Sequence, residues 1–126
     1  MLFDTDILIW LQRADEKALR TVEQDENRTI SIVTLMELLQ CARKKSQQDL
    51  IRGFLKEFGF TVMPLTENIG YRASLYIEEY SMSSGLQVAD SLIAATVVEN
   101  NLILCTGNGR HFRSVKGLKI SAFHPG

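Results

Sequence analysis

Short apolar runs alternate along the chain with stretches in which apolar residues recur every three or four positions. The first pattern is typical of buried strands and the second of amphipathic helices. We predict strands near residues 1–4, 29–33, 60–63 and 102–105, with a short last strand at 118–120. We predict helices near residues 7–13, 17–24, 34–42, 47–58, 69–80 and 87–100. Strands that alternate with helices indicate a parallel sheet covered on both faces, so the expected fold class is α/β.

Residue types with local preferences mark several element ends. Thr29–Val33 is rich in β-branched residues and is expected to form one strand. Ser46 is expected to cap the fourth helix, and Gly59 to end it. Residues 81–85 are expected to form a loop before the most apolar helix.

Composition narrows the class of protein. The chain has 126 residues, of which 45% are hydrophobic, and this fits one folded domain over residues 1–126. No apolar run approaches the ~20 residues that span a bilayer, and the acidic N-terminus lacks the basic start of a signal peptide. We therefore expect a cytoplasmic protein. Cys41 and Cys105 lie among apolar residues without a CxxC or Cys/His pattern, which favours two buried thiols over a disulfide or a zinc site.

Polar side chains follow the predicted strands or begin the next helices. They are Asp4, Asp6, Glu37, Asp90, Thr106, Asn108 and His111. Ligands of open α/β proteins bind beyond the carboxyl ends of the strands. If the sheet is parallel, these side chains converge on that edge.

Most of these residues also have a local explanation. Asp6 is placed to cap the first helix, and Glu37 fits a capping box with the threonine three residues before it. Asp90 in a first helical turn is favoured by the helix dipole, and Asn108 lies in an ordinary Gly-Asn-Gly turn. Local structure does not explain Asp4, which ends a strand before any helix begins, or the apolar neighbours of Asp90. It also does not explain why carboxylates follow several different strands.

Clustered carboxylates raise one another's pKa and repel unless a cation joins them. Mg²⁺ and Mn²⁺ prefer such oxygen ligands, and Mg²⁺ leaves room for a substrate phosphate. Asp4, Glu37 and Asp90 are therefore the expected metal-binding residues. A site of this kind can activate water and stabilise the leaving group of a phosphodiester. It also explains how a chain with a net charge of −1 could bind nucleic acid, because the bound cations supply positive charge.

Four segments, "MLFDTDILIW", "ISIVTLMELLQCA", "GLQVADSLIAATVVENNLILCTGN" and "RHFRSVKGLKI", occur in the order seen in one known family. In these segments the chain resembles the PIN-domain family, and within it the VapC-type toxins of toxin–antitoxin pairs. The resemblance covers essentially the whole chain, and the segment around Asp90 is its most specific part. It implies a three-layer α/β/α fold with a short, mostly parallel central sheet. It also implies a homodimeric endoribonuclease that depends on Mg²⁺ or Mn²⁺, leaves 5′-phosphate and 3′-hydroxyl ends, and is inhibited by a VapB-like antitoxin.

The resemblance also assigns roles to individual residues. Asp4 and Asp90 match the principal metal ligands, and Glu37 matches a position that assists a second ion or a bound water. Thr106 matches a hydroxyl position that lines the site. Asn108 stands where the family often has an aspartate; an amide can hydrogen-bond but brings no charge, which weakens the expectation of a second ion. No role is assigned to His111.

Partner surfaces are expected beside this site. Arg43–Lys45 fits either a stabilised helix C-terminus or a patch for RNA or the antitoxin. Arg110, Arg113 and Lys116 form a second loose basic group that could contact RNA phosphates. The helices also carry more apolar residues than one small core requires, which predicts a groove for an antitoxin helix. Those residues are Leu38, Leu39, Leu50, Phe54 and Phe58.

Two other functions remain open from the sequence. The "FDTD" stretch also resembles the start of haloacid-dehalogenase-type phosphatases, in which Asp4 would be a nucleophile, but the later lysine and acidic pair of that family are not evident. Alternatively, the fold could serve as a catalytically weak or inactive binding module, with Asn108 marking lost activity. Three retained carboxylates argue against that alternative, and a metal-dependent endoribonuclease toxin is the function we expect.

Overall fold

A five-stranded parallel sheet forms the centre of the protein in a computed structural model that describes all residues from 1 to 126. The strands are β1 (Leu2–Phe3), β2 (Thr29–Ser31), β3 (Thr61–Met63), β4 (Leu104–Thr106) and β5 (Ile120–Ala122). Their order in the sheet is β3-β2-β1-β4-β5, and all four neighbouring pairs are parallel. The first strand therefore lies at the centre, between β2 and β4.

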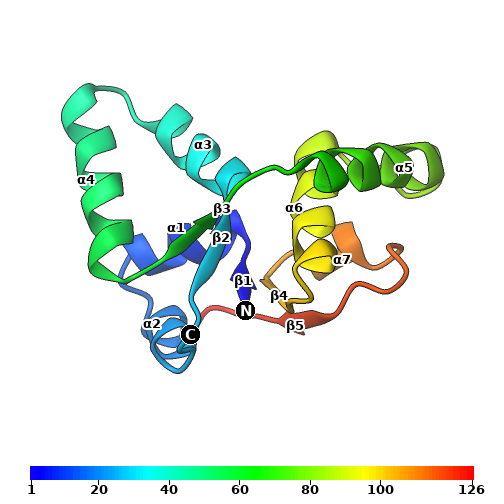
Figure 1. Ribbon diagram of the computed structural model, residues 1–126. Coiled ribbons are helices and arrows are strands. Elements are labelled where there is room, and N and C mark those ends of the chain that lie inside the picture. The colour runs from blue at the N-terminus through cyan, green and yellow to red at the C-terminus, as the bar shows by residue number, and fades with distance from the viewer.

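Seven helices connect the strands. They are α1 (Thr5–Gln12), α2 (Glu16–Glu23), α3 (Ile32–Cys41), α4 (Lys45–Glu57), α5 (Glu67–Ser84), α6 (Val88–Glu99) and α7 (Gly109–Phe112). Figure 1 shows α4 at one side of the molecule and α5 and α6 at the other, with the strands between them. The two termini lie near each other at the end of the sheet away from α3 and α5.

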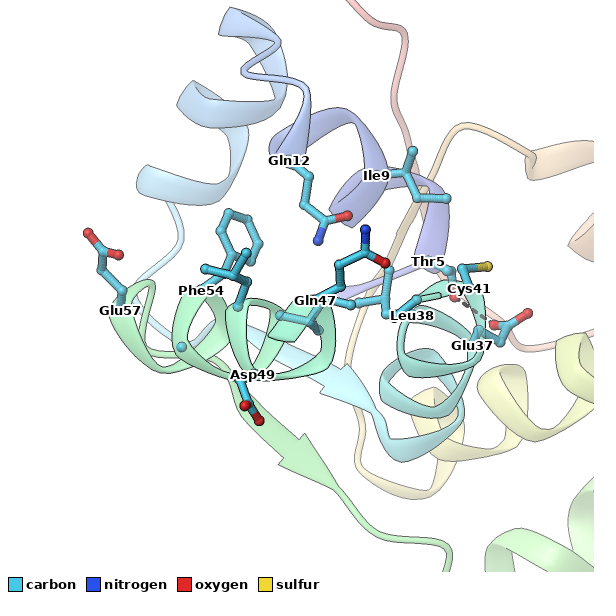
Figure 2. Close-up of a pocket in the computed structure, with 14 residues that line it drawn as sticks. Thr5, Ile9, Gln12, Glu37, Leu38, Cys41, Gln47, Asp49, Phe54 and Glu57 are labelled. Atoms are coloured by element: carbon cyan, nitrogen blue, oxygen red, sulfur yellow. Dashed lines mark hydrogen bonds between the residues drawn. The ribbon is translucent and has the colours of Figure 1, made fainter. Parts of the chain in front are cut away.

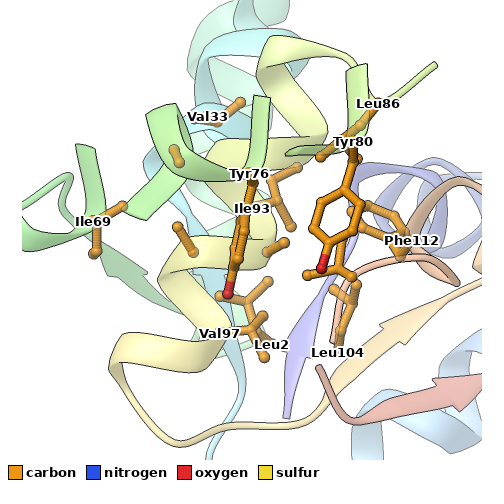
Figure 3. Close-up of a cluster of buried hydrophobic side chains, with 14 residues drawn as sticks. Leu2, Val33, Ile69, Tyr76, Tyr80, Leu86, Ile93, Val97, Leu104 and Phe112 are labelled. Carbon is orange, nitrogen blue, oxygen red and sulfur yellow. The ribbon is translucent and has the colours of Figure 1, made fainter. Parts of the chain in front are cut away.

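The pleat of the strands sends neighbouring side chains into two separate cores. Leu2 packs with α5 and α6 in one core, whereas the adjacent Phe3 packs with α1 and α2 in the other. Leu104 and Cys105 divide in the same way on β4. Figure 3 shows the first core, in which two tyrosines of α5 lie over the aliphatic side chains of α6 and β1. Two cores on opposite faces of one sheet confirm the predicted three-layer α/β/α fold.

Several predicted strand boundaries are wrong, and the strand predicted at 102–105, for example, lies at 104–106. The strand predicted at 29–33 ends at Ser31, and Ile32 and Val33 already belong to α3. The Ser31 hydroxyl accepts a hydrogen bond from the Val33 amide at 3.0 Å, so an N-cap outweighs the strand preference of the β-branched residues. The last strand lies at 120–122 instead of 118–120, where it pairs with β4.

The helices also differ from the prediction, since α1 begins at Thr5 instead of residue 7 and the short helix α7 was not predicted. The helix α4 begins at Lys45 after Lys44, so Ser46 lies inside the helix and does not cap it. The segment 81–85 is mostly helical, because α5 continues to Ser84 and ends at Gly85, which adopts a left-handed φ of 70°. The Ser84 hydroxyl donates to the Tyr80 carbonyl at 2.9 Å, which lets this polar residue remain in the last turn.

The two cysteines occupy different environments. Cys105 is buried on β4, as expected, and burial raises the pKa of its thiol to about 11. Cys41 is exposed at the end of α3, contrary to the prediction that both thiols are buried. Both are free, because Cys105 lies in the sheet and Cys41 at the surface. None of the helices is both long and apolar enough to traverse a bilayer.

Candidate active site

Asp4 lies where β1 ends and α1 begins. Its backbone amide donates to the Cys105 carbonyl of β4 at 2.9 Å, which continues the sheet for one residue. Its carboxylate accepts the Thr5 amide at 2.8 Å through Oδ1 and the Thr106 hydroxyl at 2.7 Å through Oδ2. Asp4, and not Asp6, is thus the N-cap of α1. The carboxylate is buried, and both of its oxygens accept a hydrogen bond, one from α1 and one from β4.

Thr106, the last residue of β4, links that carboxylate to the following turn. Its hydroxyl donates to Asp4 and accepts a hydrogen bond from the Asn108 backbone amide at 2.9 Å. A hydroxyl has one proton to give, so its orientation is determined by these two partners. Thr106, which was predicted to line the site, therefore positions the Asp4 carboxylate. The Asn108 side chain makes no hydrogen bond, whereas its backbone belongs to this network.

Asp6 ties α1 to the same turn. Its Oδ2 accepts a hydrogen bond from the Gly107 amide at 2.9 Å, while its Oδ1 is buried without a partner. A Cβ atom on Gly107 would lie 2.5 Å from Asp6 Oδ2, so only glycine permits this approach. Asp6 thus holds the turn after β4, and the prediction that it caps α1 is wrong.

Glu37 is held by two threonines that the sequence analysis did not identify as site residues. Thr5 Oγ1 donates to Glu37 Oε1 at 2.7 Å and lies 2.9 Å from Thr34 Oγ1. Because the Thr5 proton is given to Glu37, Thr34 must donate to Thr5. The predicted capping box is wrong, since Ser31 caps α3 and Thr34 lies inside the helix. The available signals were the position of Thr5 between two aspartates and the position of Thr34 shortly after a predicted strand.

Asp90 approaches from the first turn of α6, where a carboxylate is favoured by the helix dipole. Its Oδ2 lies 3.9 Å from Nδ1 of His111, a half-exposed residue of α7. The structure thus places α6 and α7 around the same edge as β1 and β4. His111, which had no predicted role, lies near enough to interact with the Asp90 charge.

The carboxylates of this edge influence one another's ionisation. Burial raises the pKa of Asp4, as does the charge of Glu37, against the opposing hydrogen bonds from Thr106 and Thr5. Burial also raises the pKa of Asp90, with further contributions from the charges of Asp4 and Glu37 and an opposing one from His111. Burial and the Asp4 charge raise the pKa of Asp6 to about 6. Asp4, Glu37 and Asp90 therefore share one electrostatic site.

The donors of this site suit a divalent metal ion bound through few ligands. No three His, Cys, Asp or Glu side chains gather into a group that could hold a metal, so the expected three-carboxylate cluster is not formed. The Thr5 hydroxyl holds Glu37, and carboxylates repel one another in the absence of a cation. Mg²⁺ commonly takes only one or two carboxylates together with water and phosphate. Asp4 and Asp90, two carboxylates whose pKa values are raised chiefly by burial, match that requirement.

A groove of about 870 Å³ begins at Glu37 and runs between α1, α3 and α4. Figure 2 shows Glu37 and Cys41 at one end of the groove and Phe54 and Glu57 toward the other. Of the apolar residues predicted to form a partner surface, Leu38, Leu50 and Phe54 line it, whereas Leu39 and Phe58 do not. Its floor is apolar, and Leu50 exposes 73% of its surface.

The basic segment Arg43–Lys45 lies in the turn between α3 and α4 and on the first residue of α4. All three side chains are exposed, and Lys45 pairs with Asp49 at 3.3 Å. The last turn of α3 carries no basic residue, and Arg43 directly follows its C-cap, Ala42.

Comparisons with known proteins agree with this architecture. The PIN domain family matches residues 1–118. A toxin–antitoxin complex from Klebsiella pneumoniae contains a chain that is 30% identical, with a TM-score of 0.79 over 96% of this chain and 95% of that one. The DNA-bound VapBC of Salmonella typhimurium matches with a TM-score of 0.82 at 20% identity, over 96% of each chain. VapBC-1 of nontypeable Haemophilus influenzae matches with a TM-score of 0.79 at 19% identity, also over 96% of each chain.

A search of curated proteins finds no match. The family match nevertheless covers nearly the whole length of the sequence, including every strand except the last. The chain therefore belongs to the PIN-domain family, and its structural relatives come from toxin–antitoxin complexes.

Proposed function

We propose that this protein is the toxin of a toxin–antitoxin pair and acts as a metal-dependent endoribonuclease. The observation that supports this most is the raised pKa of two carboxylates, Asp4 at the end of β1 and Asp90 in the first turn of α6, where burial is the main cause and the Asp4 charge adds to the shift at Asp90. Buried carboxylates with raised pKa values often mark functional sites, and a bound divalent cation lowers the cost of their negative charge. Family membership also removes the basis of the phosphatase alternative, which rested on the opening stretch alone.

Asp4 and Asp90 are the residues that would hold Mg²⁺ or Mn²⁺, with Glu37 beside them. When bound, the ion supplies Lewis acidity toward a phosphodiester and a nucleophilic water at neutral pH. Thr106 keeps one Asp4 oxygen in place, and the Thr34–Thr5 chain keeps Glu37 oriented. Glu37 is then poised to accept a proton from a water molecule beside it. Asn108 lines the edge without adding negative charge, which lowers the repulsion toward an RNA phosphate.

The direct test is incubation of single-stranded RNA with the protein in MnCl2 or MgCl2, and in the same buffer with EDTA. We expect cleavage only with the ions, and products with 5′-phosphate and 3′-hydroxyl ends. RNA that stays intact with both ions would contradict the proposal and favour the inactive binding module.

We also propose that the groove beside Glu37 binds the antitoxin, as a helix with an apolar face. The relatives from Klebsiella, Salmonella and Haemophilus were solved as toxin–antitoxin or VapBC complexes. The groove lining combines apolar residues with Glu37, Asp49 and Glu57 and contains no lysine or arginine. Basic side chains on the apolar helix would therefore complement it. A complex in which the partner avoids α1, α3 and α4 would exclude this site.

Homodimer formation is a further part of the proposal. Helix α5 and the start of α6 expose the large side chains of Tyr71, Leu75 and Val88, which suit contact with a second copy. Light scattering on the purified protein should give a mass twice that of the chain. A monomeric mass at high protein concentration would contradict this expectation.

A further inference from the structure

A second hollow lies on the opposite flank of the acidic edge from the groove. It has a volume of about 590 Å³ and is formed by the turn after β4, by α7, and by β5 with the residues that follow it. Thr106 and Asn108 line it, so it begins at the hydrogen-bond network that holds Asp4. A strand of substrate whose reacting phosphate lies near Asp4 can continue into this hollow.

The lining of this hollow is basic although the chain as a whole is not. Arg110, Arg113 and His124 line it, and no carboxylate does, whereas the net charge of the protein is −1. This flank therefore carries a local excess of positive charge. It corresponds to the local basic contact that a nucleic-acid-binding protein of near-zero net charge requires.

Both arginines are free to bind a ligand. Arg110 and Arg113 are exposed, and neither makes an ion pair or a hydrogen bond. By contrast, the guanidinium groups of Arg28 and Arg72 are bound to backbone carbonyls and to Glu99, respectively. Unpaired guanidinium groups that line a hollow are well suited to phosphate, which they bind in a bidentate manner.

The backbone that carries the arginines is anchored. Phe112 lies between them in the chain and is fully buried in the core formed by α5, α6 and β4. Residues three apart on a helix are neighbours, so Arg110 and Arg113 face the same side of this anchored turn. The core thus fixes the backbone positions of Arg110 and Arg113, while their side chains remain exposed to solvent.

The two flanks of the site differ in charge. The groove on the α4 side is lined by Glu37, Asp49 and Glu57 without a basic residue, and would repel phosphate. The α7 side carries Arg110 and Arg113 and would attract it. We propose that the hollow beside α7 binds the RNA strand adjacent to the scissile phosphate, with Arg110 and Arg113 contacting backbone phosphates. This inference rests on the proposed ribonuclease function and names the path of its substrate.

The test compares two double variants that remove the same charge. One is Arg110→Gln with Arg113→Gln, and the control is Arg20→Gln with Arg52→Gln, whose side chains are exposed elsewhere. Binding of a short fluorescein-labelled single-stranded RNA of mixed sequence is measured by anisotropy in EDTA, over a series of KCl concentrations. Steady-state cleavage of the same RNA is measured in MnCl2.

The first double variant should bind RNA about tenfold or more weakly, because two charge-assisted contacts are lost. Its salt slope should fall by about 1.4, since each phosphate contact to a single strand contributes about 0.7. In MnCl2 its KM should rise with little change in kcat, and the control should match the wild type throughout. Unchanged binding in the first variant, or an equal loss in both variants, would overturn the inference. Wild-type protein that binds RNA but leaves it intact in MnCl2 would instead contradict the proposed function alone.

Discussion

Three carboxylates at the acidic edge are each held by a small neighbouring residue. Asp4 accepts from the Thr106 hydroxyl, Glu37 from the Thr5 hydroxyl, and Asp6 from the Gly107 amide. These neighbours lower the cost of keeping negative charge half-buried, since hydrogen bonds to the charged form oppose desolvation. The small residues therefore position the acidic ones, and substituting them should perturb the site without removing a carboxylate.

Substitution of Thr106 by valine tests this positioning role. The change keeps the shape of the side chain but leaves Asp4 Oδ2 without its donor and the Asn108 amide without its acceptor. We expect the free energy of unfolding at neutral pH to fall by about 1–3 kcal/mol. Urea unfolding measures this, and Thr106→Ser, which keeps the hydroxyl, should restore most of the loss. Equal stability of the valine and wild-type proteins would contradict the role.

Gly107→Ala tests the close approach of Asp6 to the turn after β4. The added methyl group would meet Asp6 Oδ2 at 2.5 Å and the Phe123 carbonyl at 3.3 Å. We expect a loss of about 1–3 kcal/mol in the free energy of unfolding. The loss should shrink when Asp6 is also replaced by alanine. Gly109→Ala is the control, because its added Cβ would meet nothing within 4 Å.

At the scale of elements, helix ends build the site. The N-terminus of α1 carries Asp4 and Thr5, the first turn of α6 carries Asp90, and one turn into α3 lies Glu37. Parallel strands bring these helix starts to one edge because every strand points in the same direction. The helix α4 adds the wall of the groove next to that edge.

Leu50 on α4 provides a test of the groove. Its side chain is 73% exposed, so Leu50→Asp should leave the urea midpoint unchanged while weakening antitoxin binding at least about tenfold. Met82→Asp on α5 is the matched control, because Met82 is fully exposed and lies outside the groove. Calorimetry with the proposed VapB-like antitoxin measures both affinities. Equal affinities for the two variants would place the partner elsewhere.

Across the whole molecule, the charges of the acidic edge make stability depend on pH. Burial and the Asp4 charge raise the pKa of Asp6 to about 6 in the folded protein, above its ordinary value near 4. The folded state then binds more protons than the unfolded chain between these values. Stability contributed by the protonated group is present below about pH 4 and is lost as the pH rises through about 6. The raised pKa values of Asp4 and Asp90 act in the same direction.

We therefore expect the metal-free protein in EDTA to show a lower free energy of unfolding at pH 7 than at pH 5. Asp6→Asn should reduce this difference, because the amide does not titrate. Urea titrations at both pH values measure it, with Glu79→Gln on the exposed face of α5 as the control. A wild-type protein that becomes more stable from pH 5 to pH 7 would contradict the raised pKa values.

The order of apolar runs in the sequence predicted most of the strands and helices. The remaining features depend on side-chain contacts between residues that are far apart in the sequence. Asp4 follows an apolar strand and Asp90 lies near the start of an apolar helix. These positions indicated the site, because ligands of parallel sheets bind at the carboxyl ends of the strands. The Thr34–Thr5–Glu37 chain could not be predicted, since it joins two helices through side chains. The end of β2 was misplaced because capping by Ser31 outweighed β-branched propensity.

The central claim is that Asp4 and Asp90 together make RNA cleavage depend on a divalent ion. The most direct measurement is the single-turnover cleavage rate of single-stranded RNA in MnCl2 for the wild type, Asp4→Asn, Asp90→Asn and Glu79→Gln. We predict a fall of about a hundredfold or more for each aspartate variant, because a hundredfold loss corresponds to about 2.7 kcal/mol of lost transition-state stabilisation. Glu79→Gln should cleave at the wild-type rate, and EDTA should stop all four proteins. Wild-type rates in either aspartate variant would contradict the account.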